Sequence, residues 1–199
     1  MTRQVWDNAL IAARNAHASN SAAVEFCDFP NDIRAQTVDP FDIPAASLMA
    51  SDANLKASIY PELRDAFIAA GPVAHWRETY KETDIGADFM DRFACYCLIG
   101  SGGAFDSQQA WAWLVYMPPN LYYPHHHHPG EEIYLVVAGQ AEFYSDGDDP
   151  AILSSGAVRQ HKSNQPHAMQ TFDDPVMAMV MWRNGFETPP VWTEERPLP

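Results

Sequence analysis

The chain has 199 residues and a mass of 22.2 kDa, the size of one domain or of one domain with an appendage. Hydrophobic residues make up 47% and charged residues 19%, as in globular proteins, and no apolar run reaches the ~18–20 residues of a membrane-spanning helix. With 12 basic and 26 acidic residues the net charge is -14, which disfavours nucleic acid and anionic membranes as partners because their phosphates are repelled.

Residues 1–104 are predicted to form a mainly helical N-terminal segment. The predicted helices begin near Thr2 and cover Ser21–Phe26, 45–50 and Pro61–Ala70. Asn20 is a candidate N-cap, and a run rich in apolar and aromatic residues indicates a candidate first strand near 91–99. This part of the chain is expected to pack on the second part and to contribute to a lid or to a dimer contact.

Residues 105–199 are predicted to be a β-barrel or sandwich. Short β runs are separated by Pro, Gly, Asn and Asp, a spacing typical of antiparallel sheets. The predicted strands are 110–117, 131–137, 141–144, 151–153, 167–172 and Val176–Arg183. The Pro-rich tail over 187–199 is expected to be extended.

The cysteines and the N-terminal residues indicate the compartment. Cys27, Cys95 and Cys97 are too few, and odd in number, for a disulfide framework. Residues 1–19 lack the apolar core of a secretory signal. We therefore expect a cytoplasmic protein.

A run of four histidines followed by two glutamates predicts a metal site. Alternate side chains of a strand share a face, so His126 and His128 point together, as do Glu132 and Tyr134. If the Pro-Gly turn between them folds the second strand beside the first, two imidazoles and a carboxylate converge. His167 offers a distant fourth ligand. Such a set suits one divalent transition metal: Zn, Fe, Mn, Ni or Co.

Strand parity leaves a second register open. A slip of one residue would turn His125 and His127 inward in place of His126 and His128. A solvated histidine-rich loop is a further alternative, but it gives no reason for a carboxylate at this spacing before a strand.

These residues resemble the first motif of the cupins, G-x5-H-x-H-x3,4-E-x6-G. His126, His128, Glu132 and Gly139 stand at its positions, with Asn120 in place of the opening glycine. Two positions of the second cupin motif are matched by Gly156 and His167, and the rest of that motif is degenerate. The resemblance implies a mainly β, jelly-roll-like cupin double-stranded β-helix barrel with the metal inside. The ligands that it implies are His126, His128, Glu132 and His167.

A phenol is expected beside this metal. Tyr134 follows Glu132 by two residues on the same strand face, and a cation favours the phenolate form, which is a competent general base. The alternative is a tyrosine that only fills the barrel. Other aromatic residues crowd the region, either as barrel packing or as a surface for an organic cation.

A longer stretch, 117–139, is similar to the dimethylsulfoniopropionate (DMSP) lyases of the DddQ type. The similarity continues at 91–100, 164–168, 175–183 and 186–191. It implies cleavage of DMSP to dimethyl sulfide and acrylate by β-elimination, with Tyr134 as the base. The resemblance also implies Tyr123 as a second catalytic residue beside Tyr134. Tyr123 and Trp182 would hold the sulfonium cation, or Tyr123 would instead donate a hydrogen bond to the carboxylate. Tyr122 is a third candidate for substrate binding.

Two other functions are compatible with the same residues. One is a metal-dependent dioxygenase acting on a small organic acid, and the other is a cupin that binds a small molecule without catalysis. The expected partner is in each case a small molecule, and we expect a monomer or a homodimer.

Overall fold

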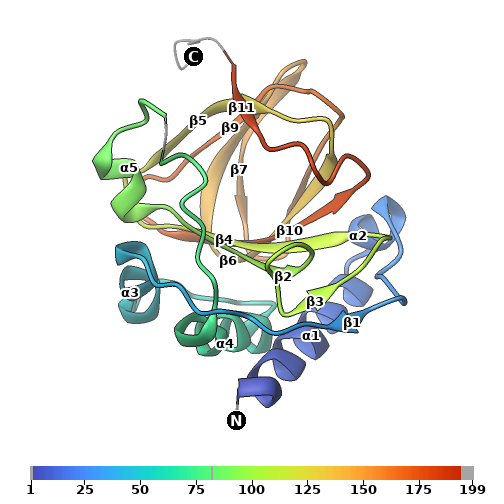
Figure 1. Ribbon diagram of the computed structural model, residues 1–199. Helices are drawn as coiled ribbons and strands as arrows, with labels where there is room; N and C mark the ends of the chain where they lie inside the picture. Colours follow the sequence, from blue (N-terminus) through green and yellow to red (C-terminus); the bar gives the residue numbers. More distant parts are fainter. Residues whose placement is uncertain (1, 82, 194–199) are drawn as a thin grey trace.

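The structure is a computed structural model that describes residues 2–81 and 83–193 (Figure 1). Helices lie in the first half of the chain and most strands in the second. The helices are α1 (Thr2–Ser19), α2 (Ser21–Phe26), α3 (Pro44–Ser51), α4 (Pro61–Ala70), the 3-10 turn η1 (Gly71–Val73) and α5 (Ala87–Arg92). The strands are β1 (Arg34–Ala35), β2 (Ala94–Ile99), β3 (Phe105–Asp106), β4 (Trp111–Met117), β5 (Tyr122–His127), β6 (Glu131–Ser145), β7 (Asp148–Ser154), β8 (Val158–His161), β9 (His167–Gln170), β10 (Val176–Arg183) and β11 (Val191–Trp192).

The helix boundaries follow local signals. Asn20 caps α2, its side chain accepting a hydrogen bond from the backbone N–H of Ala23 at 3.1 Å. Proline occupies the first turn of α3 and α4, where its missing N–H costs nothing. The helices predicted over Ser21–Phe26 and Pro61–Ala70 are confirmed. No helix in the described residues is long and apolar enough to cross a bilayer.

The strands form a double-stranded β-helix barrel, which confirms the predicted fold class. The sheet order is β1-β3-β2-β4-β10-β6-β9-β5-β11, with β7 and β8 also paired to β6. One half of β6 pairs with β10 and β8, and the other half pairs with β7 and β9. This long strand therefore connects the two sheets of the barrel.

The prediction of two separate strands over 131–137 and 141–144 is wrong, because β6 continues through Gly139. That residue has φ 68°, and the register between β6 and β10 shifts two residues before it, at Val137. A glycine in the left-handed region bends the strand from one sheet into the other without ending it.

Gly139→Ala is expected to lower the free energy of unfolding by at least about 2 kcal/mol, since it adds a strained φ and a steric clash. A Cβ at this position would lie 1.8 Å from the carbonyl oxygen of Pro175. Denaturant unfolding measures the loss. Gly147→Ala is the control, because Gly147 also has a positive φ but its Cβ would meet nothing within 4 Å. Equal losses in both variants would contradict the clash.

Two hydrophobic clusters lie on opposite faces of the sheet formed by β2, β4 and β10. Tyr96, Leu114 and Met179 face helices α1, α3 and α4, which cover the outside of the barrel (Figure 1). Val115 and Val180 face the barrel interior. The alternation along each strand therefore separates a structural core under the helices from the interior where the predicted site lies.

The described part of the C-terminal tail closes one side of the barrel. Residues Val191–Trp192 form β11 and pair with His127 and His126 of β5. The tail expected over 187–199 extends beyond the described residues, since 194–199 lie outside them.

Candidate metal centre and cavity

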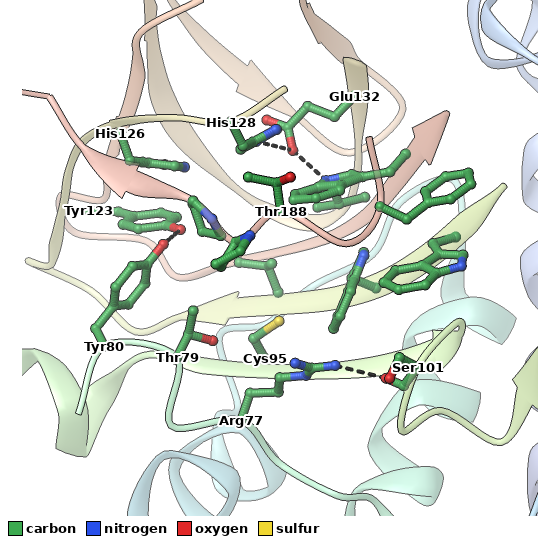
Figure 2. A pocket seen from close by; sticks show the side chains of 18 of the residues that line it. Arg77, Thr79, Tyr80, Cys95, Ser101, Tyr123, His126, His128, Glu132 and Thr188 are labelled. Carbon is green, nitrogen blue, oxygen red and sulfur yellow. Dashed lines mark hydrogen bonds and ion pairs between the residues drawn. The ribbon is translucent and has the colours of Figure 1, made fainter. Parts of the chain in front are cut away.

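A cavity of about 430 Å³ opens into the barrel interior (Figure 2). Strands β2, β4, β5, β6 and β10 supply most of its walls, and the segments around 77–80 and 186–190 complete its rim. The side chains used below that line it are Tyr80, Tyr123, His126, His128, Glu132, Tyr134 and Trp182. The cavity is thus both apolar and aromatic, with a cluster of titratable groups on one wall.

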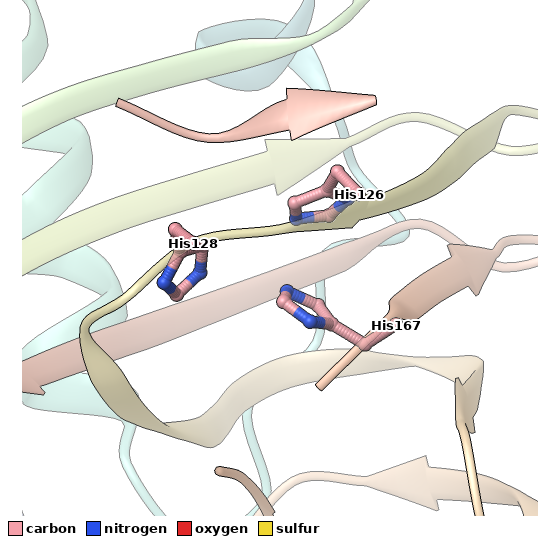
Figure 3. A group of neighbouring side chains, drawn as sticks. All are labelled: His126, His128 and His167. Atoms are coloured by element: carbon pink, nitrogen blue, oxygen red, sulfur yellow. The ribbon is translucent and has the colours of Figure 1, made fainter. Parts of the chain in front are cut away.

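Three histidines converge at this wall (Figure 3). His126 lies near the end of β5 and His128 directly follows that strand, whereas His167 begins β9, where it is the cross-strand partner of His126. Their candidate ligand atoms all lie within 4.8 Å of one another, and each residue is at most 3% exposed. The pairing of β5 with β9 therefore brings together histidines 39 and 41 residues apart in the sequence.

Each of these imidazoles has one nitrogen bound to the backbone. Nδ1 lies within hydrogen-bond distance of a carbonyl oxygen two residues away and donates to it. The acceptors are Pro124 for His126, Gly130 for His128 and Gln165 for His167, at 2.8, 2.9 and 2.8 Å. This bond leaves the proton on Nδ1 and the lone pair on Nε2, as in histidines that bind metals.

Glu132 is the anionic member of the cluster and is 1% exposed. Its Oε1 lies 2.9 Å from Nε2 of His167, and its Oε2 lies 3.3 Å from Nε2 of His128. Burial opposes ionisation of this carboxyl, but positive charge on the neighbouring His167 and His128, together with hydrogen bonds, outweighs it and holds the pKa of Glu132 well below the usual range. A metal ion bound between these groups would supply the same positive charge. Glu132 is therefore a carboxylate.

The cluster fits a divalent transition metal. Nε2 of His128 and of His167 is buried without a hydrogen-bond partner among the described residues, although a carboxylate lies nearby. Burial, followed by His167, lowers the pKa of His126 well below its ordinary value and so keeps it neutral. Lone pairs that face a carboxylate repel it unless a cation lies between them. The donor set of imidazole nitrogens and one carboxylate suits Zn, Fe, Mn, Ni or Co.

The structure does not adopt the alternative register. His127 points away from the cluster, and its Nδ1 shares a hydrogen bond with Oγ1 of Thr193 at 2.9 Å. Nδ1 of His125 is hydrogen-bonded to the hydroxyl of Tyr122 at 3.0 Å. Neither His125 nor Tyr122 is among the residues that line the cavity, so a role of Tyr122 in substrate binding stays a prediction.

Tyr123 reaches the cavity through a β-bulge. The register between β5 and β9 shifts between Tyr123 and His126, so both side chains face inward although they are three residues apart. Their rings stack at 4.1 Å. The hydroxyl of Tyr123 is hydrogen-bonded to that of Tyr80, a cavity residue that no sequence motif indicated (Figure 2).

Tyr134 and Trp182 complete the wall around Glu132. Tyr134 is 3% exposed, and burial, followed by the charge of Glu132, raises the pKa of its phenol well above 10. Trp182 donates its indole N–H to Oε2 of Glu132 at 2.7 Å and stacks on His128 at 4.1 Å. The indole thus orients two members of the cluster as well as lining the cavity.

His161 is a further member of the cluster that the sequence did not indicate. It ends β8 and is 2% exposed, and its Nδ1 donates a hydrogen bond to Oε1 of Glu132 at 2.7 Å. Burial, followed by His167, lowers its pKa to about 4 against the opposing effect of Glu132. With Glu132 and His167 it forms a second group whose candidate ligand atoms lie within 4.8 Å.

The comparisons with known proteins agree with this architecture. The family model of dimethylsulfoniopropionate lyase matches residues 19–178. Dimethylsulfoniopropionate lyase DddQ of Ruegeria pomeroyi is 50% identical over 192 residues, 96% of each chain. The crystal structure of DMSP lyase DddQ from Ruegeria pomeroyi DSS-3 superposes with a TM-score of 0.94 at 49% identity, covering 97% of this chain and 99% of that one. A second structure, described as crystal structures of the DMSP lyases RdDddP and RnDddQII, superposes with a TM-score of 0.93 at 33% identity. The match covers 98% of this chain and 100% of that one. The similarity therefore includes both the helical part and the barrel.

Proposed function

The chain belongs to the DMSP lyase family, and on that premise we propose that it is a metal-dependent carbon–sulfur lyase that cleaves DMSP to dimethyl sulfide and acrylate. The observation that carries the proposal is the identity of 50% with a DMSP lyase along almost the whole chain. The buried cluster of histidines and Glu132 inside an aromatic cavity supports it.

The cavity wall supplies ligands for one divalent metal. The proposed ligands are His126, His128, Glu132 and His167. When bound there, the metal supplies positive charge that holds the substrate carboxylate, stabilises negative charge on the adjacent carbon and favours the phenolate of Tyr134.

The elimination itself requires a base and a place for the leaving group. Tyr134, as phenolate, removes the proton from the carbon next to the substrate carboxylate. The electron pair of that C–H bond forms the double bond of acrylate, and the C–S bond breaks with its electrons on sulfur. The sulfonium therefore leaves as neutral dimethyl sulfide, and Tyr134 returns its proton to solvent.

Aromatic side chains hold the substrate cation. Trp182 and Tyr123 line the cavity on either side of the cluster and offer ring faces to a sulfonium. The hydroxyl of Tyr123 is a hydrogen-bond donor for the substrate carboxylate, and Tyr80 fixes the orientation of that hydroxyl.

Tyr80→Phe is expected to lower kcat/KM for DMSP about 3- to 10-fold, the effect of one lost hydrogen bond. The phenylalanine keeps the ring that stacks on Trp192 at 4.2 Å and removes only the contact with Tyr123. Steady-state kinetics measure the change. If the double variant Tyr80→Phe/Tyr123→Phe has the same kcat/KM as Tyr123→Phe alone, Tyr80 acts through Tyr123. An unchanged kcat/KM in Tyr80→Phe would contradict this role.

The first experiment measures dimethyl sulfide in the headspace over purified protein and DMSP, with and without a chelator. Sulfide release that stops on chelation and returns with added metal is expected. Equal sulfide release with and without the chelator would contradict the metal dependence. No release from metal-loaded protein would contradict the lyase activity, and oxygen consumption on small organic acids would then identify a dioxygenase.

We also propose a cytoplasmic location, which the free thiols of Cys27, Cys95 and Cys97 support. Detection of the native protein in fractionated cells tests it. Whether the chain is a monomer or a homodimer stays a prediction.

A further inference from the structure

His161 occupies none of the defined positions of either cupin motif, since it falls in the variable segment between Gly156 and Lys162, yet it contacts the centre of the metal cluster. It is the cross-strand partner of Glu132 in the pairing of β8 with β6. The side chain is almost fully buried, and Nδ1 lies 2.7 Å from Oε1 of Glu132. The ring stacks on that of His167 at 4.0 Å and 14°. His161 therefore contacts two of the four proposed ligands.

The orientation of His161 differs from that of the proposed histidine ligands. His126, His128 and His167 donate Nδ1–H to a backbone carbonyl and direct Nε2 toward the cluster. The Nδ1 atom of His161 instead faces a carboxylate, and its Nε2 is buried without a hydrogen-bond partner among the described residues.

This difference decides which nitrogen carries the proton. A neutral imidazole has one N–H. If His161 bound the metal through Nδ1, its N–H would move to Nε2, where a buried donor without an acceptor costs about 1–3 kcal/mol. With the proton on Nδ1, the Glu132 carboxylate receives a short hydrogen bond, and only the lone pair on Nε2 is left without a partner among the described residues. The geometry thus favours a donor over a ligand.

Glu132 is consequently held on both oxygens. Trp182 donates an N–H to Oε2 at 2.7 Å, and His161 donates an N–H to Oε1 at 2.7 Å. Partners of this kind fix a ligating carboxylate in one orientation, and their loss typically costs 10–100-fold in metal affinity.

We propose that His161 is a positioning residue of the metal centre, which orients the Glu132 carboxylate through Nδ1–H and is not itself a ligand. The inference rests on the proposed metal dependence, but it makes no assumption about the substrate.

Two substitutions separate the hydrogen bond from the ring. His161→Asn retains an N–H donor close to the position of Nδ1 and removes the stacked ring. His161→Phe retains a ring against His167 and removes the donor. We expect His161→Phe to bind Co²⁺ about 10–100-fold more weakly than the unchanged protein and His161→Asn to bind within about 3-fold of it. Competition with a chromophoric chelator measures the affinity, and the visible Co²⁺ spectrum reports the ligand set.

The outcomes distinguish the possible roles. Equal affinity of His161→Phe and the unchanged protein would overturn the proposal, and so would an equal loss in both variants, which would indicate ring packing. A Co²⁺ spectrum altered in His161→Asn would make His161 a ligand. If His161→Phe does not fold, as judged by circular dichroism, His161→Gln replaces it, because Gln places its amide nitrogen near Nε2 and is expected to lose affinity relative to His161→Asn.

These measurements use no DMSP. Failure of the lyase activity with the expected order of Co²⁺ affinities would refute the proposed function and leave the role of His161 intact. If the protein released sulfide but the unchanged protein, His161→Phe and His161→Asn bound Co²⁺ equally well, the proposed function would stand and the role of His161 would be refuted.

Discussion

Tyr134→Phe is expected to lower kcat for DMSP cleavage about 10³-fold, within the range that a positioned general base contributes. The substitution removes one hydroxyl and keeps the ring, which packs against Phe143 at 5.7 Å. The His and Glu side chains of the cluster make their contacts without the phenol, so metal content measured by mass spectrometry is expected to match that of the unchanged protein.

A second buried tyrosine provides the control for this variant. Tyr96 lies in the cluster under the helices, outside the cavity, and donates its hydroxyl proton to the carbonyl oxygen of Phe67 at 3.0 Å. Tyr96→Phe is expected to lower stability by about 1 kcal/mol and to leave kcat unchanged. If Tyr134→Phe lost metal in proportion to activity, Tyr134 would be chiefly a ligand. If it kept full activity, another group would be the base.

Period-two alternation was sufficient to predict which histidines converge. His126 on β5 and His128 just after it both line the cavity, as do Glu132 and Tyr134 on one face of β6, as the sequence predicts. The alternation holds because the two faces of β6 meet different surroundings: Ile133 and Leu135 pack in the cluster under the helices, whereas Tyr134 packs in the barrel interior. The barrel and the helices over Ser21–Phe26 and Pro61–Ala70 followed from equally local signals.

The same alternation could not place Tyr123. By parity Tyr122 shares the face of His126, but the bulge in β5 turns Tyr123 inward. One sequence signal was present, since Pro124 lies within the bulge. Proline cannot donate to a sheet ladder and is confined to edges and bulges.

The remaining site residues depend on pairings between distant segments. β8 carries no apolar alternation, so its four residues, Val158–His161, gave no strand signal. His161 meets Glu132 only because β8 pairs with β6 in that register. Tyr80 reaches Tyr123 from a loop whose path is determined by packing against Trp192 and Phe89. Both contacts, His161 with Glu132 and Tyr80 with Tyr123, join residues far apart in the sequence, so no local pattern predicts them.

His167→Ala and Glu132→Ala are expected to lose bound metal and sulfide release together. Loss of a residue that hydrogen-bonds to a metal ligand typically lowers metal affinity about 10–100-fold. Loss of a ligand itself is therefore expected to lower metal affinity more than about 100-fold. Metal analysis after dialysis against a chelator measures the loss. A bound ion stabilises only the folded state, so chelator is expected to lower the Tm of the unchanged protein and to leave the Tm of both variants unaltered.

His127→Ala is the matched control, because it removes an imidazole from the same histidine run. Its side chain lies on the opposite face of β5 from the cluster, bound to Thr193. This variant is expected to retain metal, sulfide release and the response of Tm to chelator, whereas His126→Ala should lose all three. The reverse result would mean that the functional protein adopts the register shifted by one residue. Retention of activity in His126→Ala would contradict the proposed set of ligands.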